Sequence, residues 1–125
     1  MALIYDDFAK WLDGVFEREI PDDVVALSFN IYEDGKRRWS VEVVGTSSFD
    51  IGGEDWACDG ATDFETRNDP FSWDEKTNWK NVASEVAEAV QKYLEGGRCS
   101  DKLKTLRGVA TGFVDGDLNL LYVKE

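Results

Sequence analysis

The apolar residues near the start of the chain recur at the spacing of a helix. Between residues 5 and 18 they return every three or four positions, as Phe8, Leu12 and Phe16 show. This is the apolar stripe of an amphipathic helix. Pro21 follows, and the residue before a proline is pushed out of the helical region. The pattern predicts a helix over residues 5–18.

Apolar and polar residues then alternate strictly, which is the period of a β-strand. Two alternating runs fill residues 24–44 on either side of Asp34-Gly35, a strong signal for a hairpin turn. Two further runs fill residues 109–123 around Asp115-Gly116. We predict two β-hairpins. The core-facing positions of the first are Leu27, Phe29, Ile31, Trp39, Val41 and Val43.

Helical spacing returns between residues 76 and 95, and Gly96-Gly97 supplies a C-terminal stop. The apolar stripe of this second helix begins at Trp79, so we assign Trp79 to the core, as we do Trp11 and Trp39. Ser100-Asp101 favours one short further helical turn.

The stretch between the first hairpin and the second helix is less regular. Residues 47–51 are a candidate third strand that Gly52-Gly53 would end, and residues 55–58 a candidate short further strand. The polar residues around Asp69-Pro70 are typical of a loop.

The order of these elements predicts one α+β domain spanning residues 1–125. We expect an antiparallel sheet of four to five strands built from two hairpins, with the two main helices packed on one face. A length of 125 residues fits one domain. A hydrophobic content of 42% excludes a disordered chain, which combines high charge with low hydrophobicity.

The charge of the chain is strongly negative, with 26 acids, 14 bases and a net charge of −12. This disfavours nucleic-acid binding, which needs basic clusters, and docking on anionic membranes. No apolar run reaches the roughly 18–20 residues that cross a bilayer. The first residues have neither a basic region nor a long apolar stretch, so we expect no signal peptide and a cytoplasmic location.

The acids are concentrated in the middle of the chain. Residues 50–75 hold nine acids and one base, a net charge of −8. Large aromatic residues are interleaved with these acids, and Trp56 and Trp73 fall outside any core periodicity. Carboxylates that steer a basic partner and aromatic anchors that supply buried area suit a protein-binding surface. We predict partner-binding roles for Asp50, Glu54, Asp55, Trp56, Asp59, Asp63, Glu65, Asp69, Trp73 and Asp74.

Two other interpretations of this segment stay open. In the first, the aromatic residues of the segment fold back as a satellite core, and its acids only keep the surface of the domain hydrated. In the second, Asp55, Asp59 and Asp63 bind a divalent cation, although their spacing lacks the EF-hand pattern.

Candidate chemistry is sparse. The chain contains no histidine, which excludes Ser-His-Asp and Cys-His catalysis and an imidazole base. Neither pair of adjacent glycines has the context of a phosphate-binding loop. Cys58 and Cys99 do not form a C-x-x-C pair, and we interpret them as reduced thiols. We therefore expect no enzyme, and no catalytic, cofactor-binding or metal-binding residue.

Two stretches carry a resemblance to a known class of proteins. They are Asp74-Glu75-Lys76-Thr77-Asn78-Trp79, which leads into the second helix, and the closing Gly112-Phe113-Val114-Asp115-Gly116-Asp117-Leu118. The chain resembles the small acidic immunity proteins of bacterial polymorphic-toxin and contact-dependent inhibition systems. The resemblance implies a cytoplasmic protein that binds a cognate toxin domain and blocks its active site. Many such toxins are basic nucleases, and the class has no shared catalytic residues.

The leading functional hypothesis is a stoichiometric inhibitor that neutralises a basic toxin through the acidic, aromatic-containing surface. One alternative is a structural or regulatory interaction protein that acts as a homodimer through an open sheet edge. A second alternative is a carboxylate-metal enzyme.

Overall fold

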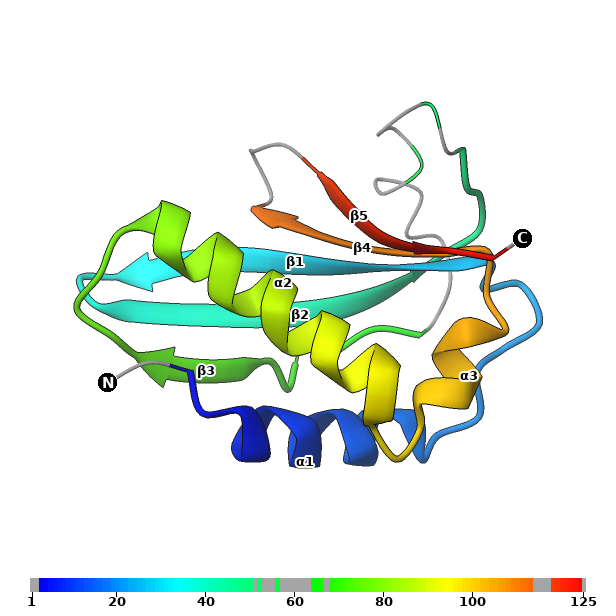
Figure 1. Ribbon diagram of the computed structural model, residues 1–125, viewed down its shortest axis with the longest axis horizontal. Coiled ribbons are helices and arrows are strands. Elements are labelled where there is room, and N and C mark those ends of the chain that lie inside the picture. Colours follow the sequence, from blue (N-terminus) through cyan, green and yellow to red (C-terminus); the bar gives the residue numbers. More distant parts are fainter. Residues whose placement is uncertain are drawn as a thin grey trace.

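The computed structural model of the chain is an α+β structure with one five-stranded sheet and three helices (Figure 1). It describes residues 3–50, 52, 56, 64–66, 68–113 and 118–124. The elements, in chain order, are α1 (Tyr5–Phe16), β1 (Ala26–Gly35), β2 (Arg38–Thr46), β3 (Phe71–Asp74), α2 (Trp79–Gly96), α3 (Ser100–Lys104), β4 (Gly108–Phe113) and β5 (Asn119–Val123).

The sheet is mixed, not purely antiparallel as the sequence predicted. Its strand order is β3-β2-β1-β4-β5, and β1 pairs with β4 in parallel while the other neighbours are antiparallel. The reason is the connection after β3. Helix α2 carries the chain across the sheet to the free side of β1, and a helical crossover of this kind brings the next strand in parallel.

The first hairpin is confirmed, but its turn lies two residues later than Asp34-Gly35. The turn residues are Lys36 and Arg37, and Arg37 adopts a positive φ of 66°. A turn centred on Asp34-Gly35 would place Ile31 opposite Arg38 and every core residue of β1 opposite a polar one. The observed register pairs Ile31 with Val41, with an irregularity between residues 33 and 35. Burial of one face therefore decides the register over the local turn preference.

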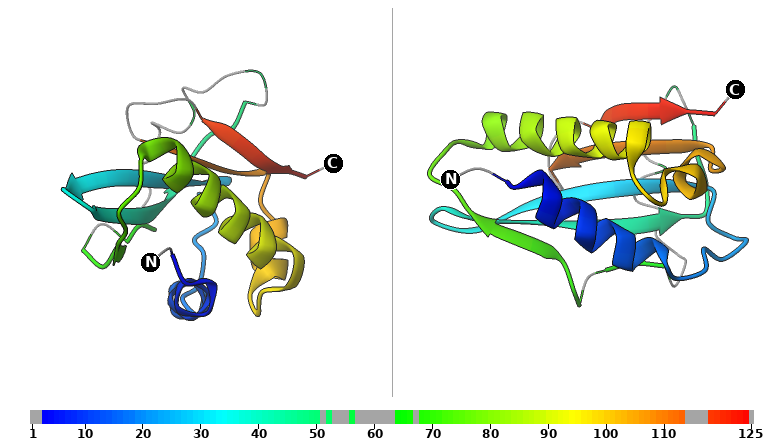
Figure 2. Two further views of the ribbon diagram at one scale, coloured as in Figure 1. Left: turned by 60° about the vertical axis from the view of Figure 1, so that its left-hand side comes forward. Right: turned by 60° about the horizontal axis from the view of Figure 1, so that its bottom comes forward.

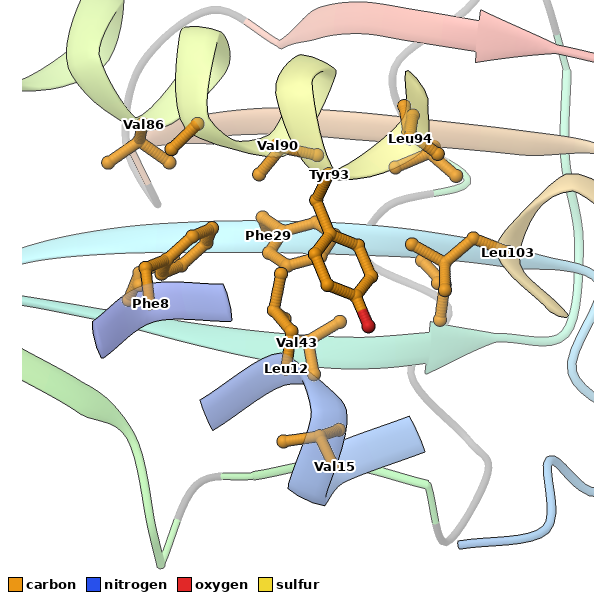
Figure 3. Packing of buried hydrophobic residues seen from close by; sticks show 14 of the residues in the cluster. Phe8, Leu12, Val15, Phe29, Val43, Val86, Val90, Tyr93, Leu94 and Leu103 are labelled. Carbon is orange, nitrogen blue, oxygen red and sulfur yellow. The ribbon is translucent and has the colours of Figure 1, made fainter. Parts of the chain in front are cut away.

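The two main helices, α1 and α2, cover one face of the sheet, as the sequence predicted, and α3 packs into the core on the same face (Figure 2). Apolar residues of α1 and α2 meet the inward residues of β1 and β2 in a single core (Figure 3). Tyr93 lies at its centre, where its hydroxyl donates to Asp13 Oδ1 of α1 at 2.7 Å and accepts from the Cys99 backbone N–H at 3.1 Å. One side chain thus ties both main helices to the start of α3.

The opposite face of the sheet is also covered, which the sequence did not predict. Every residue of β2 after Arg38 is buried, so both faces of this strand are shielded from water. Phe49 and Trp56 pack over Ala26 and Ala110 on this second face. These two described residues of the chain that follows β2 therefore cover part of the second face of the sheet.

The third strand is Phe71–Asp74 and not residues 47–51. Residues 47–50 are not in a strand, and Ile51 lies outside the described residues. The Thr46 hydroxyl donates to the Ser48 carbonyl at 3.0 Å, which turns the chain away from the sheet. Of the proposed strand at residues 55–58, only Trp56 is described, so that prediction is not tested.

Trp79 was assigned to the core and is instead 57% exposed. It is the first residue of α2, and this first turn projects beyond the end of β4 (Figure 1). The ring meets Phe113 edge-on at 6.2 Å, and Lys80 Nζ lies 5.7 Å from its centroid. Trp39 is buried as predicted, whereas Trp11 is only half-buried.

The second helix ends at Gly96, as predicted, and the second hairpin is present as β4 and β5. Its turn, Asp115-Gly116, lies outside the described residues. Among the described residues, no helix combines the length and the apolar character that crossing a membrane would require.

Gly97 and Gly96 are a matched pair for testing the packing of Tyr93. A Cβ on Gly97 would lie 2.4 Å from the Tyr93 ring, whereas a Cβ on Gly96 would meet nothing within 4 Å. We expect Gly97→Ala to destabilise the fold by about 1–3 kcal/mol, since the buried ring has no room to move. Gly96→Ala should be neutral or slightly stabilising. Urea unfolding followed by circular dichroism measures both, and equal midpoints for the two variants would contradict this account.

Candidate partner-binding surface

The acidic segment, residues 50–75, begins on one side of the sheet and ends on another. Phe49, just before it, and Trp56 pack on the face away from the helices. Phe64 belongs to the helix-side core, and residue 65 forms an isolated bridge with Val44 of β2. The segment then becomes β3, the edge strand next to β2. Its described parts are thus fixed to the sheet at several points.

The aromatic residues of this segment point inward. Trp56 and Trp73 were expected to be exposed anchors, but they are only 3% and 8% exposed, so that expectation is wrong. Trp56 packs edge-on against Phe49 with a centroid distance of 4.9 Å. Trp73 faces the helix-side core, and its indole N–H donates to Glu75 Oε1 at 3.1 Å. These rings hold the segment to the domain and offer little surface to a partner.

Three of the described carboxylates of the segment are exposed, namely Asp50, Asp69 and Asp74. Glu65 and Glu75 are half-buried, and Glu75 accepts the Trp73 indole N–H. Asp74 pairs with Arg38 at 2.9 Å, and Asp50 Oδ1 accepts the Gly52 backbone N–H at 3.0 Å. The other four predicted acids lie outside the described residues and are Glu54, Asp55, Asp59 and Asp63.

Helix α1 lies beside β3, at the end of this segment (Figure 2), and this neighbourhood could not be predicted from the sequence. Phe8 contacts Phe71 edge-on at 5.3 Å, and the Trp11 indole N–H donates to the Asp69 carbonyl at 3.0 Å. We call α1 together with residues 64–74 the acidic edge. Its exposed carboxylates are Asp6, Asp7, Asp69 and Asp74. The structure therefore brings Glu65, Asp69 and Asp74 together along one edge, while Asp50 lies apart.

A groove of about 500 Å³ runs along the acidic edge between α1 and residues 65–69. One end is closed by Arg18, whose guanidinium lies 4.8 Å from the Phe64 ring centroid and donates to the Glu65 carbonyl at 3.2 Å. The residues lining the groove are Lys10, Trp11, Gly14, Val15, Arg18, Glu65, Thr66, Asn68 and Asp69.

Gly14 forms part of this groove from within α1. A glycine in a helix interior costs about 1 kcal/mol relative to alanine. Gly14 has no positive φ that would require glycine, and a Cβ there would meet nothing within 4 Å. Neither the backbone conformation nor the internal packing of the described chain accounts for the missing side chain. Its effect is to keep the groove open.

Two carboxyl groups meet where β3 gives way to α2. Burial, a hydrogen bond to Glu75 and the negative charges of Glu75 and Glu88 together raise the pKa of Glu85 from 4.5 to about 7, although a hydrogen bond with the Leu3 backbone acts in the opposite direction. Glu85 Oε2 is buried and has no hydrogen-bond donor among the described residues. A raised pKa favours the protonated form of Glu85, which can donate a hydrogen bond to Glu75.

A third carboxylate, Glu42, is buried on the sheet face away from the helices. It is 3% exposed, and its Oε2 accepts from Asn30 Nδ2 at 3.1 Å and from the Tyr32 hydroxyl. Ser28 donates to Asn30 Oδ1 at 2.8 Å, which extends the network along β1. Alternation placed these residues on the polar side of the first hairpin, but it could not show that this side is covered.

The described residues contain no group of three or more side chains suited to holding a metal ion. The three aspartates considered for a cation, Asp55, Asp59 and Asp63, lie outside those residues. Cys99 is a free thiol, and Cys58 is not described. The chemistry that the described surface offers is charge and hydrogen bonding to another molecule.

Comparison of the chain with protein-family models, with curated proteins and with solved structures finds no match in any of the three. The function must therefore be argued from the surface itself.

The carboxyl pair predicts how stability depends on pH. Because the folded-state pKa of Glu85 is raised, the folded chain binds more protons than the unfolded chain between pH 4.5 and about 7. The stabilisation is complete below the unfolded pKa and is lost as pH rises through 7. We expect the melting temperature to fall between about pH 5 and pH 8, and Glu85→Gln to reduce that fall and to be the more stable protein at pH 8.

Thermal melts across this pH range test the expectation. Glu95→Gln removes an exposed carboxylate near the end of the same helix and should leave the slope of the parent protein unchanged. A Glu85→Gln variant with the same pH profile as the parent would show that the pair does not share a proton.

Proposed function

We propose that this chain is a stoichiometric protein-binding inhibitor of the immunity type, which neutralises a basic bacterial toxin domain through the acidic edge. One observation carries the proposal. Trp56, Phe64 and Trp73 of the acidic segment fold inward, whereas its carboxylates Asp50, Asp69 and Asp74 face the solvent, so negative charge is displayed on a fixed framework. The resemblance of residues 74–79 and 112–118 to immunity proteins points the same way.

The charge distribution supports a basic partner. Of the exposed acids on the acidic edge, Asp74 is paired with Arg38, whereas Asp69 has no cationic partner within the part of the chain that the structure describes. The protein as a whole carries a net charge of −12, which attracts positively charged surfaces over a distance of about one Debye length, near 8–10 Å in physiological salt.

The framework supports a preformed surface. β3 is hydrogen-bonded to β2 over four residue pairs, and α1 is held against it by the Trp11 indole and by ring contacts. A surface that needs little ordering on association loses less conformational entropy when the complex forms. Inhibition then requires only that the bound chain covers the active site of its partner.

The first experiment identifies the partner. The tagged chain is purified from the cells that make it, and bound proteins are identified by mass spectrometry. The proposal expects one basic protein in a 1:1 complex, whose toxicity on separate expression is abolished when the chain is co-expressed. A partner with an acidic surface, or a toxicity that the chain does not relieve, would refute it.

The second experiment tests the surface. The triple variant Asp7→Asn, Asp69→Asn, Asp74→Asn removes three exposed charges from the acidic edge. We expect its association rate with the captured partner to fall by about tenfold at low salt, and the difference to shrink as salt is added.

A matched triple variant controls for net charge. Asp22→Asn, Glu95→Gln, Asp101→Asn removes three exposed charges carried by other elements. It should change the association rate much less. Equal effects of the two triples would mean that total charge, and not the acidic edge, governs binding.

A further inference from the structure

The groove on the acidic edge repeats one arrangement at its two ends. At the first end an aromatic ring and an oxygen acceptor hold a guanidinium, which is that of Arg18 against Phe64 and the Glu65 carbonyl. At the second end Trp11 and Asp69, an exposed aspartate, line the groove. Among the described residues, Asp69 forms no ion pair with a lysine or an arginine.

We propose that this second end of the groove binds an arginine side chain of the partner, with its guanidinium against the Trp11 ring and its N–H groups directed at the Asp69 carboxylate. The inference rests on the proposed function, since it identifies which part of a basic partner enters the acidic edge. Arginine fits better than lysine because its planar group can stack on an indole and donate to a carboxylate at once.

Contacts within the domain already hold the Trp11 ring in the position that stacking of a guanidinium would require. Its indole N–H donates to the Asp69 carbonyl at 3.0 Å, and its ring packs beside Phe8 and Phe71 with centroid distances of 5.8 Å to each. The residue is half-buried, so part of it remains open to the groove. An arriving guanidinium finds the aromatic wall in place.

Gly14 supplies the room that the incoming chain needs. It lines the same groove, and the space where its side chain would stand is empty. A glycine at a point of close approach lets another chain pass near the helix backbone. Binding of a partner chain therefore explains why a residue that destabilises the helix stands at position 14, whereas the packing of the isolated domain does not explain it.

Lys10 also lines the groove and opposes an incoming cation. It is exposed and makes no ion pair with Asp69 in the described structure. The proposal therefore expects Lys10→Gln to tighten binding of an arginine side chain, whereas a general role of Lys10 in folding would not.

The probe is the peptide acetyl-Gly-Ser-Arg-Ser-Gly-amide, added to the ¹⁵N-labelled full chain. We expect saturable shifts of the Gly14 amide and of the Trp11 indole N–H. The same peptide with citrulline in place of arginine has nearly the same shape without the charge, and it should bind about two- to fivefold more weakly, as should the arginine peptide to Asp69→Asn.

Gly14→Gln fills the groove and separates binding from folding. It should raise the melting temperature by about 2 to 4 °C, because glutamine is the better helix former, and abolish the saturable shifts. Gly96→Gln is the matched control, also at a helical glycine with open space, and should leave the shifts intact. If Gly14→Gln fails to fold, Asp69→Asn and Lys10→Gln decide the question, since both change exposed side chains.

Three outcomes would overturn the inference. They are equal affinity for the arginine and citrulline peptides, unchanged peptide binding by folded Gly14→Gln, and arginine-dependent shifts centred on Asp50 or Asp74 instead of Gly14. Each leaves the proposed function standing if the acidic-edge triple variant still slows association with the captured partner. Failure of that separate experiment would refute the proposed function without reference to the peptide.

Discussion

Burial of β1 and β2 on both faces is the condition on which the rest of the structure depends. The helices can shield only one face of these strands. The other face carries buried apolar residues, such as Ala26, and buried polar residues, such as Glu42. Another part of the chain must therefore shield that face from water. Phe49 and Trp56 do so where they pack over Ala26 and Ala110. The acidic segment is consequently part of the architecture as well as the bearer of charge.

This dual role explains the division between side chains in the segment. Burying an aromatic side chain contributes more apolar area than any other single residue can, whereas burying an unpaired carboxylate is costly. Rings turn inward and carboxylates turn outward under the same physical rule. An interface built in this way has rigid charges and few exposed rings, and the half-buried Trp11 and the exposed Trp79 are the indoles that remain accessible in the described chain.

Much of the fold follows from local pattern, and the exceptions have physical causes. Helical and alternating periodicity located α1, α2 and both hairpins to within a few residues. Parallel pairing of β1 with β4 could not be foreseen, because alternation specifies a buried face and not a neighbour. Strand β3 was not predicted, because a strand of four residues directly after Pro70 is too short to show a clear alternation of apolar and polar residues. Trp79 lies on the apolar stripe, but a stripe does not show that the neighbouring strand β4 ends before the first turn of the helix.

For the candidate site, the sequence supplied the acids but not their geometry. A count of charges identified Asp69 and Asp74, since composition is independent of folding. Trp56 and Trp73 were misassigned because an aromatic residue outside a regular period can be buried by tertiary contacts alone. The pairing of α1 with residues 64–74, and the groove that results, depends on contacts across more than fifty positions, such as that between Trp11 and Asp69.

The parallel pair at the centre of the sheet also bears on the order in which the molecule assembles. β1 lies in the first third of the chain and its neighbour β4 close to the other end, so joining Ala26 to Gly108 closes a loop of about eighty residues. During synthesis, the hairpin of β1 and β2 can form early, yet one side of β1 has no strand beside it until β4 has left the ribosome. Nascent chains that stall before that point expose an apolar strand edge, and such edges are where newly made proteins associate wrongly.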